Sequence, residues 1–417
     1  MSSLTIATML MFTALPELIA PQHPIPASRD GRQAGLIGAP APNLSRAIDL
    51  AADYLERACG MNGRFAYRVD TTSGRQSSSY NIVRHAGAMY VLGMFNNSHP
   101  DPQAVNAMIR AAGFLRVNYI GPDARSNTLV VWSRPLPMKS DAGLGASGLG
   151  LAALASVQQA RPNTVPLEQL QALGRFILYL QKDDGSFTSK YLPDSGPSSD
   201  WQSLYYPGEA ALGLIALDEI DHSNEWLTAA GRALSYLARS REGAREVPPD
   251  HWALIATAKF LPHINEIPTR DRVSCCASRA ELVAHAIRIS RSFLQDQIAN
   301  SPDARLNGGF DPRGGTTQTA TRLEGLLATL EFLPAEDAAL RAQIEAAAKS
   351  GIEFLLRAQI ATGPYAGGMP QTVLGDGSDP KNAELRGSDV RIDYVQHALS
   401  AWLRYQHLHL DGEGGRQ

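Results

Sequence analysis

Helix-forming segments of two kinds alternate along this chain from about residue 43 onward, and this alternation constrains the fold more than any other feature. Apolar residues recur at steps of three and four, with Pro- and Gly-rich breaks between segments, as expected for helices. One kind of segment carries charges along one face. The other kind is rich in small residues and nearly uncharged after its first turns. A helix that is apolar all round is buried, whereas one with a charged face lies at the surface.

The two kinds alternate strictly and predict six outer and six inner helices. The outer segments are 43–58, 102–119, 167–181, 224–240, 279–298 and 337–359, and the inner segments are 80–95, 141–157, 207–219, 249–260, 317–333 and 391–405.

The connections between these segments also repeat. Outer segments run into a Gly-aromatic turn in "ACGMNGRFAY", "QKDDGSF" and "NSPDARLNGGF", with "GPYAGGM" as a looser copy. Such recurrence is typical of stacked supersecondary units that bury a shared core only together. We therefore expect one domain over 43–410, preceded by a leader over 1–42 and followed by a flexible tail over 411–417.

Six outer–inner hairpins that close on themselves form an all-α toroid, and this pattern resembles the (α/α)6 toroids of carbohydrate-active enzymes. Glycoside hydrolases, polysaccharide lyases and sugar epimerases share that architecture. The resemblance covers almost the entire chain after residue 43, but no catalytic signature of one family is matched, so it assigns no residue roles. "QKDDGSF" is also similar to the repeat of triterpene cyclases, whose DxDD acid motif is missing here. We expect the motif to be structural.

The first twenty residues contain an apolar run, "LTIATMLMFTALPELIA", followed by a Pro-rich stretch. The run is compatible with a cleaved signal segment and a periplasmic or secreted protein. However, a signal segment normally begins with basic residues, and here the first basic residue is Arg29, while Glu17 interrupts the apolar run. The sequence therefore favours a cytoplasmic location as strongly as export. Because the run is short and carries Pro16, we expect no stable membrane span.

Composition narrows the classes of partner. A formal net charge of −3 and 44% hydrophobic residues give a large core and no basic field for nucleic acid. The three cysteines, Cys59, Cys275 and Cys276, form no disulfide framework and show no metal-binding spacing. We expect no nucleic acid, metal or cofactor, and a carbohydrate as the binding partner.

Polar side chains gather at the N-terminal ends of all six inner segments. If these helices run the same way, the polar groups converge on one face of the ring, which we call the rim. The candidate catalytic residues are Asp141, Glu209, Asp393 and His85, and the candidate substrate-binding residues are Tyr80, Arg84, Trp201, Tyr205, Tyr206, His251, Trp252, Arg322, Glu324, Arg391 and His397.

Two carboxylates across a cleft hydrolyse a glycosidic bond when one acts as general acid and the other activates water. Glu209 and Asp141 are the preferred pair because they lie nearest the opening. Arginine forks bind carboxylates, and aromatic rings stack on sugar faces. We therefore expect a glycoside hydrolase acting on an acidic, uronic-acid-containing poly- or oligosaccharide.

Three alternatives remain open at this level. A lyase or uronyl epimerase would use a base such as His85, His251 or Tyr206 beside a sugar carboxylate. A noncatalytic glycan-binding or assembly protein would use the same arginines and aromatic residues to hold a chain. A metal site would need His85, His251 and His397 to meet through the fold, because no two of these histidines have a local ligand spacing.

Overall fold

The protein is an all-α toroid in the computed structural model, which describes residues 25, 43–270, 272, 276–375 and 386–414. These residues contain twelve α-helices, and all twelve predicted helical segments are confirmed. The outer helices are α1 (Leu44–Ala58), α3 (Pro102–Asn118), α5 (Leu167–Tyr179), α7 (Asn224–Ser240), α10 (Arg279–Gln295) and α12 (Ala338–Ala358). The inner helices are α2 (Ile82–Ser98), α4 (Leu144–Ala160), α6 (Tyr206–Asp221), α8 (His251–Phe260), α11 (Thr316–Leu330) and α13 (Ile392–Gly414).

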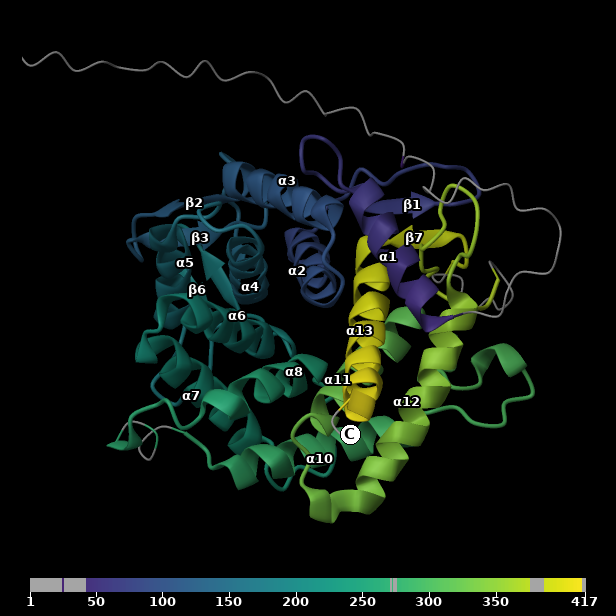
Figure 1. The fold of residues 1–417 in the computed structure, drawn as a ribbon. Helices are drawn as coiled ribbons and strands as arrows, with labels where there is room; N and C mark the ends of the chain where they lie inside the picture. The colour runs from purple at the N-terminus through teal and green to yellow at the C-terminus, as the bar shows by residue number, and fades with distance from the viewer. Residues whose placement is uncertain (1–24, 26–42, 271, 273–275, 376–385, 415–417) are drawn as a thin grey trace, which may run out of the picture.

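The inner helices form a closed ring (Figure 1). Each inner helix packs against the next one along the chain, and the last inner helix, α13, packs against the first, α2. The outer helices surround this ring, and each contacts its inner partner. Segments far apart in sequence, at the two ends of the described chain, therefore become neighbours.

Small residues let the inner helices approach one another closely. A Cβ added at Gly148 of α4 would lie 2.6 Å from the Ala210 Cα of α6, and one added at Gly213 would lie 2.3 Å from the Gly148 carbonyl oxygen. Real Cβ atoms do not approach other heavy atoms so closely, so glycine is required at both positions. The small-residue composition of the inner segments thus has a packing cause.

The repeated Gly-aromatic turns join neighbouring outer helices. Gly63, in the turn after α1, has φ +81°, and its added Cβ would lie 1.9 Å from the Arg110 carbonyl oxygen of α3. Gly367, in the turn after α12, has φ +87° and would approach the Leu50 carbonyl oxygen of α1 to 1.8 Å. A left-handed backbone pressed against a helix is a position for glycine alone. The same arrangement recurs at Gly185 against Arg232 and at Gly308 against Ser350.

Three glutamines reinforce these joints. Each lies just after an outer helix and donates from Nε2 to a backbone carbonyl of the next outer helix in the ring. The bonds are Gln181 to Ala229 O at 2.9 Å, Gln297 to Ala347 O at 2.8 Å and Gln359 to Ala47 O at 2.9 Å. The glutamine of "QKDDGSF" is therefore a structural residue, and the Gln359 bond closes the outer ring from α12 to α1.

The described residues also form seven short strands, which lie in the connections between helices. The sequence analysis did not predict them. The antiparallel pairs are β1 (Arg68–Asp70) with β7 (Asp389–Arg391), β2 (Ile120–Asp123) with β3 (Thr128–Val131), and β5 (Lys190–Leu192) with both β4 (Ala142–Gly143) and β6 (Gly196–Ser198). β4 and β7 run directly into α4 and α13. They therefore fix the N-terminal ends of two inner helices.

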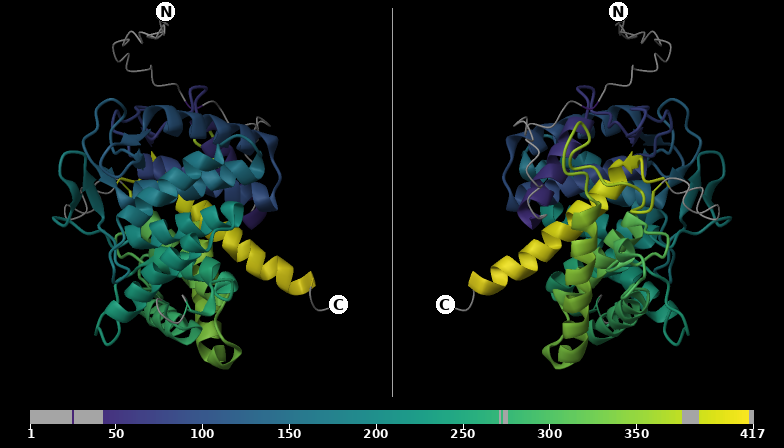
Figure 2. Two further views of the ribbon diagram at one scale, coloured as in Figure 1. Left: turned by 90° about the vertical axis from the view of Figure 1, so that its left-hand side faces the viewer. Right: turned by 90° about the vertical axis from the view of Figure 1, so that its right-hand side faces the viewer.

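The chain ends differ in part from expectation. Helix α13 continues through Gly414 and projects from the body (Figure 2), so helix extends beyond the predicted boundary at residue 410. Apart from Ile25, which is buried, the predicted leader lies outside the described residues, as does Cys275. Within the described part of the chain, no helix is both long enough and apolar enough to cross a membrane.

Candidate active site

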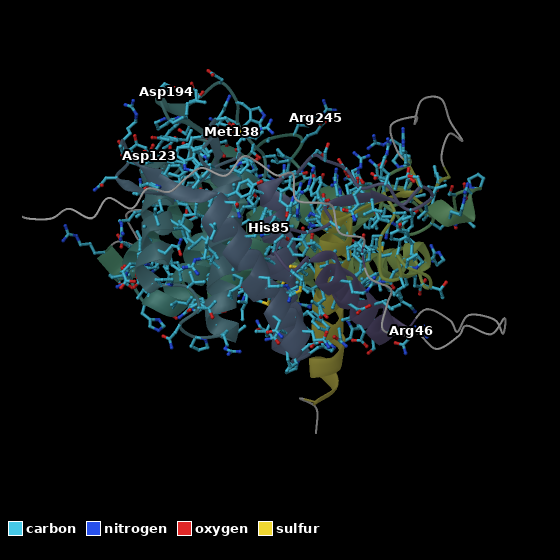
Figure 3. The ribbon with its side chains drawn as sticks, turned by 90° about the horizontal axis from the view of Figure 1, so that it is seen from above. Arg46, His85, Asp123, Met138, Asp194 and Arg245 are labelled. Atoms are coloured by element: carbon cyan, nitrogen blue, oxygen red, sulfur yellow. The ribbon has the colours of Figure 1, made fainter. Side chains whose placement is uncertain are left out.

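The N-terminal ends of the inner helices lie on the side opposite to the projecting end of α13. Figure 3 shows Met138, Asp194 and Arg245 on that side, while α13 leaves the body on the other. Met138 and Arg245 belong to the connections that lead into α4 and α8. The connections into these inner helices therefore lie on one side of the ring, and the residues expected at the rim can be placed individually.

Three ionisable side chains from three inner helices meet inside the ring. His397 Nδ1 of α13 lies 2.8 Å from Glu324 Oε2 of α11, a hydrogen-bond distance. His251, the first residue of α8, places Nε2 3.8 Å from the same oxygen. The two imidazole rings are edge-to-face, with centroids 5.5 Å apart. We call these three residues the His-Glu-His cluster.

Burial and charge give the two histidines opposite protonation preferences. Burial disfavours the charged form of His397, but the Glu324 carboxylate outweighs it, so the pKa of His397 is raised above its usual value. Burial lowers the pKa of His251 well below its usual value, and the positive charges of His397 and Arg322 lower it further. At neutral pH the cluster thus presents a neutral imidazole beside one that favours the proton.

Several buried polar atoms at the rim have no hydrogen-bond partner among the described residues. They are both ring nitrogens of His251, Glu324 Oε1, Glu209 Oε2 and Arg322 Nε. The Tyr205 ring links them, because it packs edge-to-face on His251 at 5.2 Å and is close enough to Arg322 and Glu209 for their charges to affect its pKa. Unsatisfied buried polar atoms are rare in folded proteins, so the five gathered here make this part of the rim the candidate ligand site.

Glu209 is a buried carboxyl group that favours its neutral form. Burial, and secondarily the negative charge of Asp250, raise its pKa to about 8. Its Oε2 lies over Gly145 of α4, where an added Cβ would be only 2.1 Å away. Glu209 is therefore equipped to donate a proton near neutral pH.

Asp250 fixes the start of α8, next to Glu209 and His251. It caps α8 by accepting a hydrogen bond from the Ala253 amide at 3.0 Å, and its other oxygen accepts from Arg241 Nη2 at 2.8 Å. The capping bond fixes the first turn of α8, which carries His251 and the buried Trp252. Sequence reasoning missed Arg241, because nothing local distinguishes it from other basic residues after α7.

Asp393 binds two of the arginines that were expected to hold substrate. Arg391 makes a two-pronged contact with it at 2.5 and 2.9 Å, and Arg84 Nε lies 3.0 Å from Oδ2. Arg84 also donates to the Tyr67 hydroxyl. Both oxygens of Asp393 are therefore engaged by guanidinium groups. Arg322, whose ion-pair partner Asp296 lies 3.8 Å away, is left as the least compensated arginine of the rim.

Asp141 lies at the edge of the rim and is partly exposed. Its two oxygens accept hydrogen bonds from Ser133 at 2.9 Å and Ser140 at 2.7 Å. Its charge and that of Glu209 both affect Tyr206, whose pKa is raised to about 12, chiefly by burial. Tyr206 in turn contacts the half-exposed Trp201 at a ring-centroid distance of 5.4 Å. Asp141 and Glu209 therefore flank one aromatic residue.

His85 and Tyr80 do not join the cluster, which corrects their expected placement. His85 is fully buried (Figure 3), with Nδ1 2.8 Å from the Tyr80 hydroxyl and Nε2 3.0 Å from the Ala111 carbonyl oxygen of α3. Burial lowers its pKa to about 4. The Tyr80 hydroxyl also accepts from the Phe65 amide. Both residues are satisfied structural groups between an inner and an outer helix.

The His-Glu-His cluster also has the donor set of a metal site. One ligand atom from each residue lies within 4.8 Å of the others, and two histidines with a glutamate suit zinc or ferrous iron. The 2.8 Å contact between His397 and Glu324 is, however, explained by their hydrogen bond, and the positive charge of Arg322 beside His251 opposes a cation. The fold thus brings His251 and His397 together, without His85.

Comparisons with known proteins establish the fold. No protein-family model and no curated sequence match the chain. Solved structures do match, among them a sugar epimerase from a ruminal bacterium, with TM-score 0.62, 10% identity, and coverage of 87% of this chain and 98% of that one. A D-mannose isomerase has TM-score 0.59, 10% identity and coverage of 87% and 97%.

An α-1,6-mannanase from Salegentibacter has TM-score 0.59, 12% identity and coverage of 88% of this chain and all of that one. These matches span nearly the whole length of each neighbour. At such low identity they show a shared architecture alone. The chain therefore has the (α/α)6 toroid fold, and the resemblance stated from sequence is confirmed at that level.

Proposed function

We propose that this protein is a sugar-active enzyme that moves a proton at a carbon next to a carbonyl group, as an epimerase or an aldose–ketose isomerase does. The observation that carries the proposal is the geometry of the His-Glu-His cluster: a buried histidine whose pKa burial lowers lies beside a second histidine whose pKa is raised by a carboxylate at hydrogen-bond distance. The structural likeness to a sugar epimerase and a D-mannose isomerase agrees with it.

In this mechanism His251 is the base and His397 is the acid. His251 removes the proton from the carbon, and the electron pair of the broken C–H bond moves toward the carbonyl oxygen to form an enediolate. Arg322 stabilises the negative charge that develops on oxygen. His397, protonated and oriented through Nδ1 by Glu324, donates its proton. Delivery to the opposite face of the same carbon, with the electron pair returning from oxygen to rebuild the carbonyl group, inverts that carbon. Delivery to the former carbonyl carbon gives the isomer when the hydroxyl proton of the first carbon moves to the former carbonyl oxygen in the same step. Exchange with solvent then returns a proton to His397 and removes one from His251.

Tyr205 belongs to the immediate surroundings of the base, because its ring packs edge-to-face against His251. Aromatic residues at the entrance, including the half-exposed Trp201, provide apolar faces for a sugar. A uronic acid suits the site if its carboxylate binds Arg322. Arg84 and Arg391 both pair with Asp393. Of the three arginines that the sequence offered for binding an acidic substrate, only Arg322 is therefore left for this role.

The decisive test is isotope exchange. The protein is incubated in D2O with neutral aldoses and with uronates, and proton NMR follows loss of the signal from the carbon next to the carbonyl and growth of an epimer or ketose. His251→Asn and His397→Asn are each expected to lower the exchange rate about 100-fold or more. Substrate turnover without solvent exchange, or full activity in both variants, would contradict the mechanism.

A second function, hydrolysis of a glycosidic bond, is favoured by one separate observation. Glu209 has a pKa of about 8 and shares Tyr206 with Asp141, as a general acid and a base would need. Release of reducing ends from oligosaccharides, abolished by Glu209→Gln or Asp141→Asn and retained in His251→Asn, would support hydrolysis over epimerisation. Saturable sugar binding with neither product nor exchange would indicate a noncatalytic binding protein.

A further inference from the structure

The ring contains a polar cavity at the end opposite to the rim, where the C-terminal halves of the inner helices converge. Its volume is about 380 Å³, within the range of small-molecule sites. Lys259 follows His251 by eight residues on α8, and Arg404 follows His397 by seven on α13. At the rise of an α-helix these intervals correspond to about 12 and about 10 Å. The cavity is therefore distinct from the His-Glu-His cluster.

The charged side chains around this cavity are balanced. Arg404 Nη1 lies 2.5 Å from Glu331 Oε1, and Lys259 Nζ lies 3.8 Å from Glu219 Oε1. Glu219 also accepts a hydrogen bond from Gln159 at 3.0 Å. Two carboxylates thus face two cations, so a ligand of either charge would leave a like charge facing it. The cost is largest at the Arg404–Glu331 pair, whose arginine side chain is 8% exposed.

The hydrogen-bonding capacity of these groups is only partly used. The Lys259–Glu219 separation is too long for a hydrogen bond. Arg404 is 8% exposed, and its Nε has no hydrogen-bond partner among the described residues. Tyr90 adds an aromatic face and a hydroxyl close enough to both Lys259 and Arg404 to be affected by their charges. Unused donors and acceptors thus alternate around one space.

An apolar wall completes the cavity. Met94, Leu212, Ile215 and Leu403 line it together with these polar groups. Vicinal hydroxyls present donors and acceptors at short, regular intervals, and the C–H faces of a sugar ring pack on apolar side chains. Balanced charge, mixed hydrogen-bonding groups and an apolar wall together select a neutral, hydroxyl-rich molecule.

We propose that this cavity is a second ligand site, which binds a neutral polyol the size of a monosaccharide. The ligand's hydroxyl groups bond to the Lys259–Glu219 and Arg404–Glu331 pairs, and its ring packs between Tyr90 and the apolar wall. This site is independent of the proposed function, because none of its groups belongs to the His-Glu-His cluster.

Saturation-transfer NMR and calorimetry on the full chain test the proposal, with D-glucose, D-mannose and myo-inositol as neutral probes and D-glucuronate and D-glucosamine as charged ones. The His397→Ala variant reports on binding at the active site. We expect at least one neutral probe to bind saturably, equally well in the parent and in His397→Ala, and at least tenfold more tightly than either charged probe.

Two variants locate the site by different means. Glu219→Gln breaks the charge balance, and Ala216→Phe fills the cavity with a side chain from its wall. Each should weaken binding of the neutral probe at least tenfold, whereas Lys349→Met, at an exposed position on α12, should not. Circular dichroism and thermal melts establish that the variants fold. Absence of saturable binding, binding lost only in His397→Ala, or equal binding of a charged probe would overturn the proposal.

Discussion

Glu324 Oε2 accepts a hydrogen bond from His397 Nδ1 at 2.8 Å, across the contact between α11 and α13. This bond joins an acidic residue in the middle of one inner helix to a histidine near the start of another. It fixes the orientation of the imidazole, and it raises the pKa of His397 despite burial. The relationship therefore determines which histidine holds the proton.

The first prediction concerns the pH dependence of activity. If protonated His397 is the acid, the rate falls as pH rises through its pKa. Glu324→Gln removes the charge that raises this pKa, so the alkaline limb of the kcat profile should move to lower pH by about one to two units. NMR titration of His397 checks the same shift without substrate. An unchanged limb with a simple loss of stability would assign Glu324 a packing role only.

The second prediction concerns stability and Glu209. Folding raises the pKa of this carboxyl group from 4.5 to about 8, so the native state binds more protons between these values and its stability falls as pH rises through them. Glu209→Gln removes this loss. We expect the variant to exceed the parent in unfolding free energy at pH 9, by at most about 5 kcal/mol, and the advantage to shrink toward pH 4. Urea unfolding at both pH values measures it.

The third prediction compares two glycines in one turn region. Gly367 and Gly363 both have positive φ, +87° and +82°, but an added Cβ would lie 1.8 Å from the Leu50 carbonyl oxygen at Gly367 and has no atom within 4 Å at Gly363. Gly363→Ala should cost about 1 kcal/mol, from backbone conformation alone, and Gly367→Ala clearly more. Thermal melts of both variants test this, and equal losses would show that the close approach is unimportant.

The fourth prediction concerns metal removal. Under the acid–base mechanism, dialysis against EDTA should leave the exchange rate unchanged, and metal analysis of the purified protein should find no stoichiometric zinc or iron. Loss of activity on chelation, restored by one equivalent of added zinc, would instead identify His251, Glu324 and His397 as metal ligands. His263→Asn provides a control for both measurements, because that histidine pairs with Glu266, outside the cluster.

The helices and their order were predictable, but the detailed chemistry of the rim was not. Periodicity is local, so segments such as 224–240 could be placed within a residue or two. The convergence of His251 and His397 follows from ring closure and was anticipated in general terms. The contact partners of individual side chains could not be predicted. Asp393, for example, pairs with two arginines, and His85 lies at hydrogen-bond distance from the Ala111 carbonyl oxygen. These contacts depend on side-chain directions between helices, which spacing does not encode.

The short strands were missed for a related reason. β4 has two residues and β1 three, and stretches so brief show no measurable alternation. They form because the chain must cross the end of the ring to enter each inner helix. Their hydrogen bonds come from neighbouring connections rather than from local preference.

The glutamine and glycine joints link four of the six neighbouring pairs of outer helices, and one of these pairs is α12 with α1. Gln359 donates a hydrogen bond to the Ala47 carbonyl and so joins the last outer helix to the first. Gln181 and Gln297 make the same kind of bond between outer helices that follow one another in the chain. A cut in a connection that carries none of these glycines and glutamines would leave every joint intact if the present ends were tethered by a linker. A circularly permuted chain should therefore adopt the same fold. Its new ends could be placed so that they lie away from both openings of the ring.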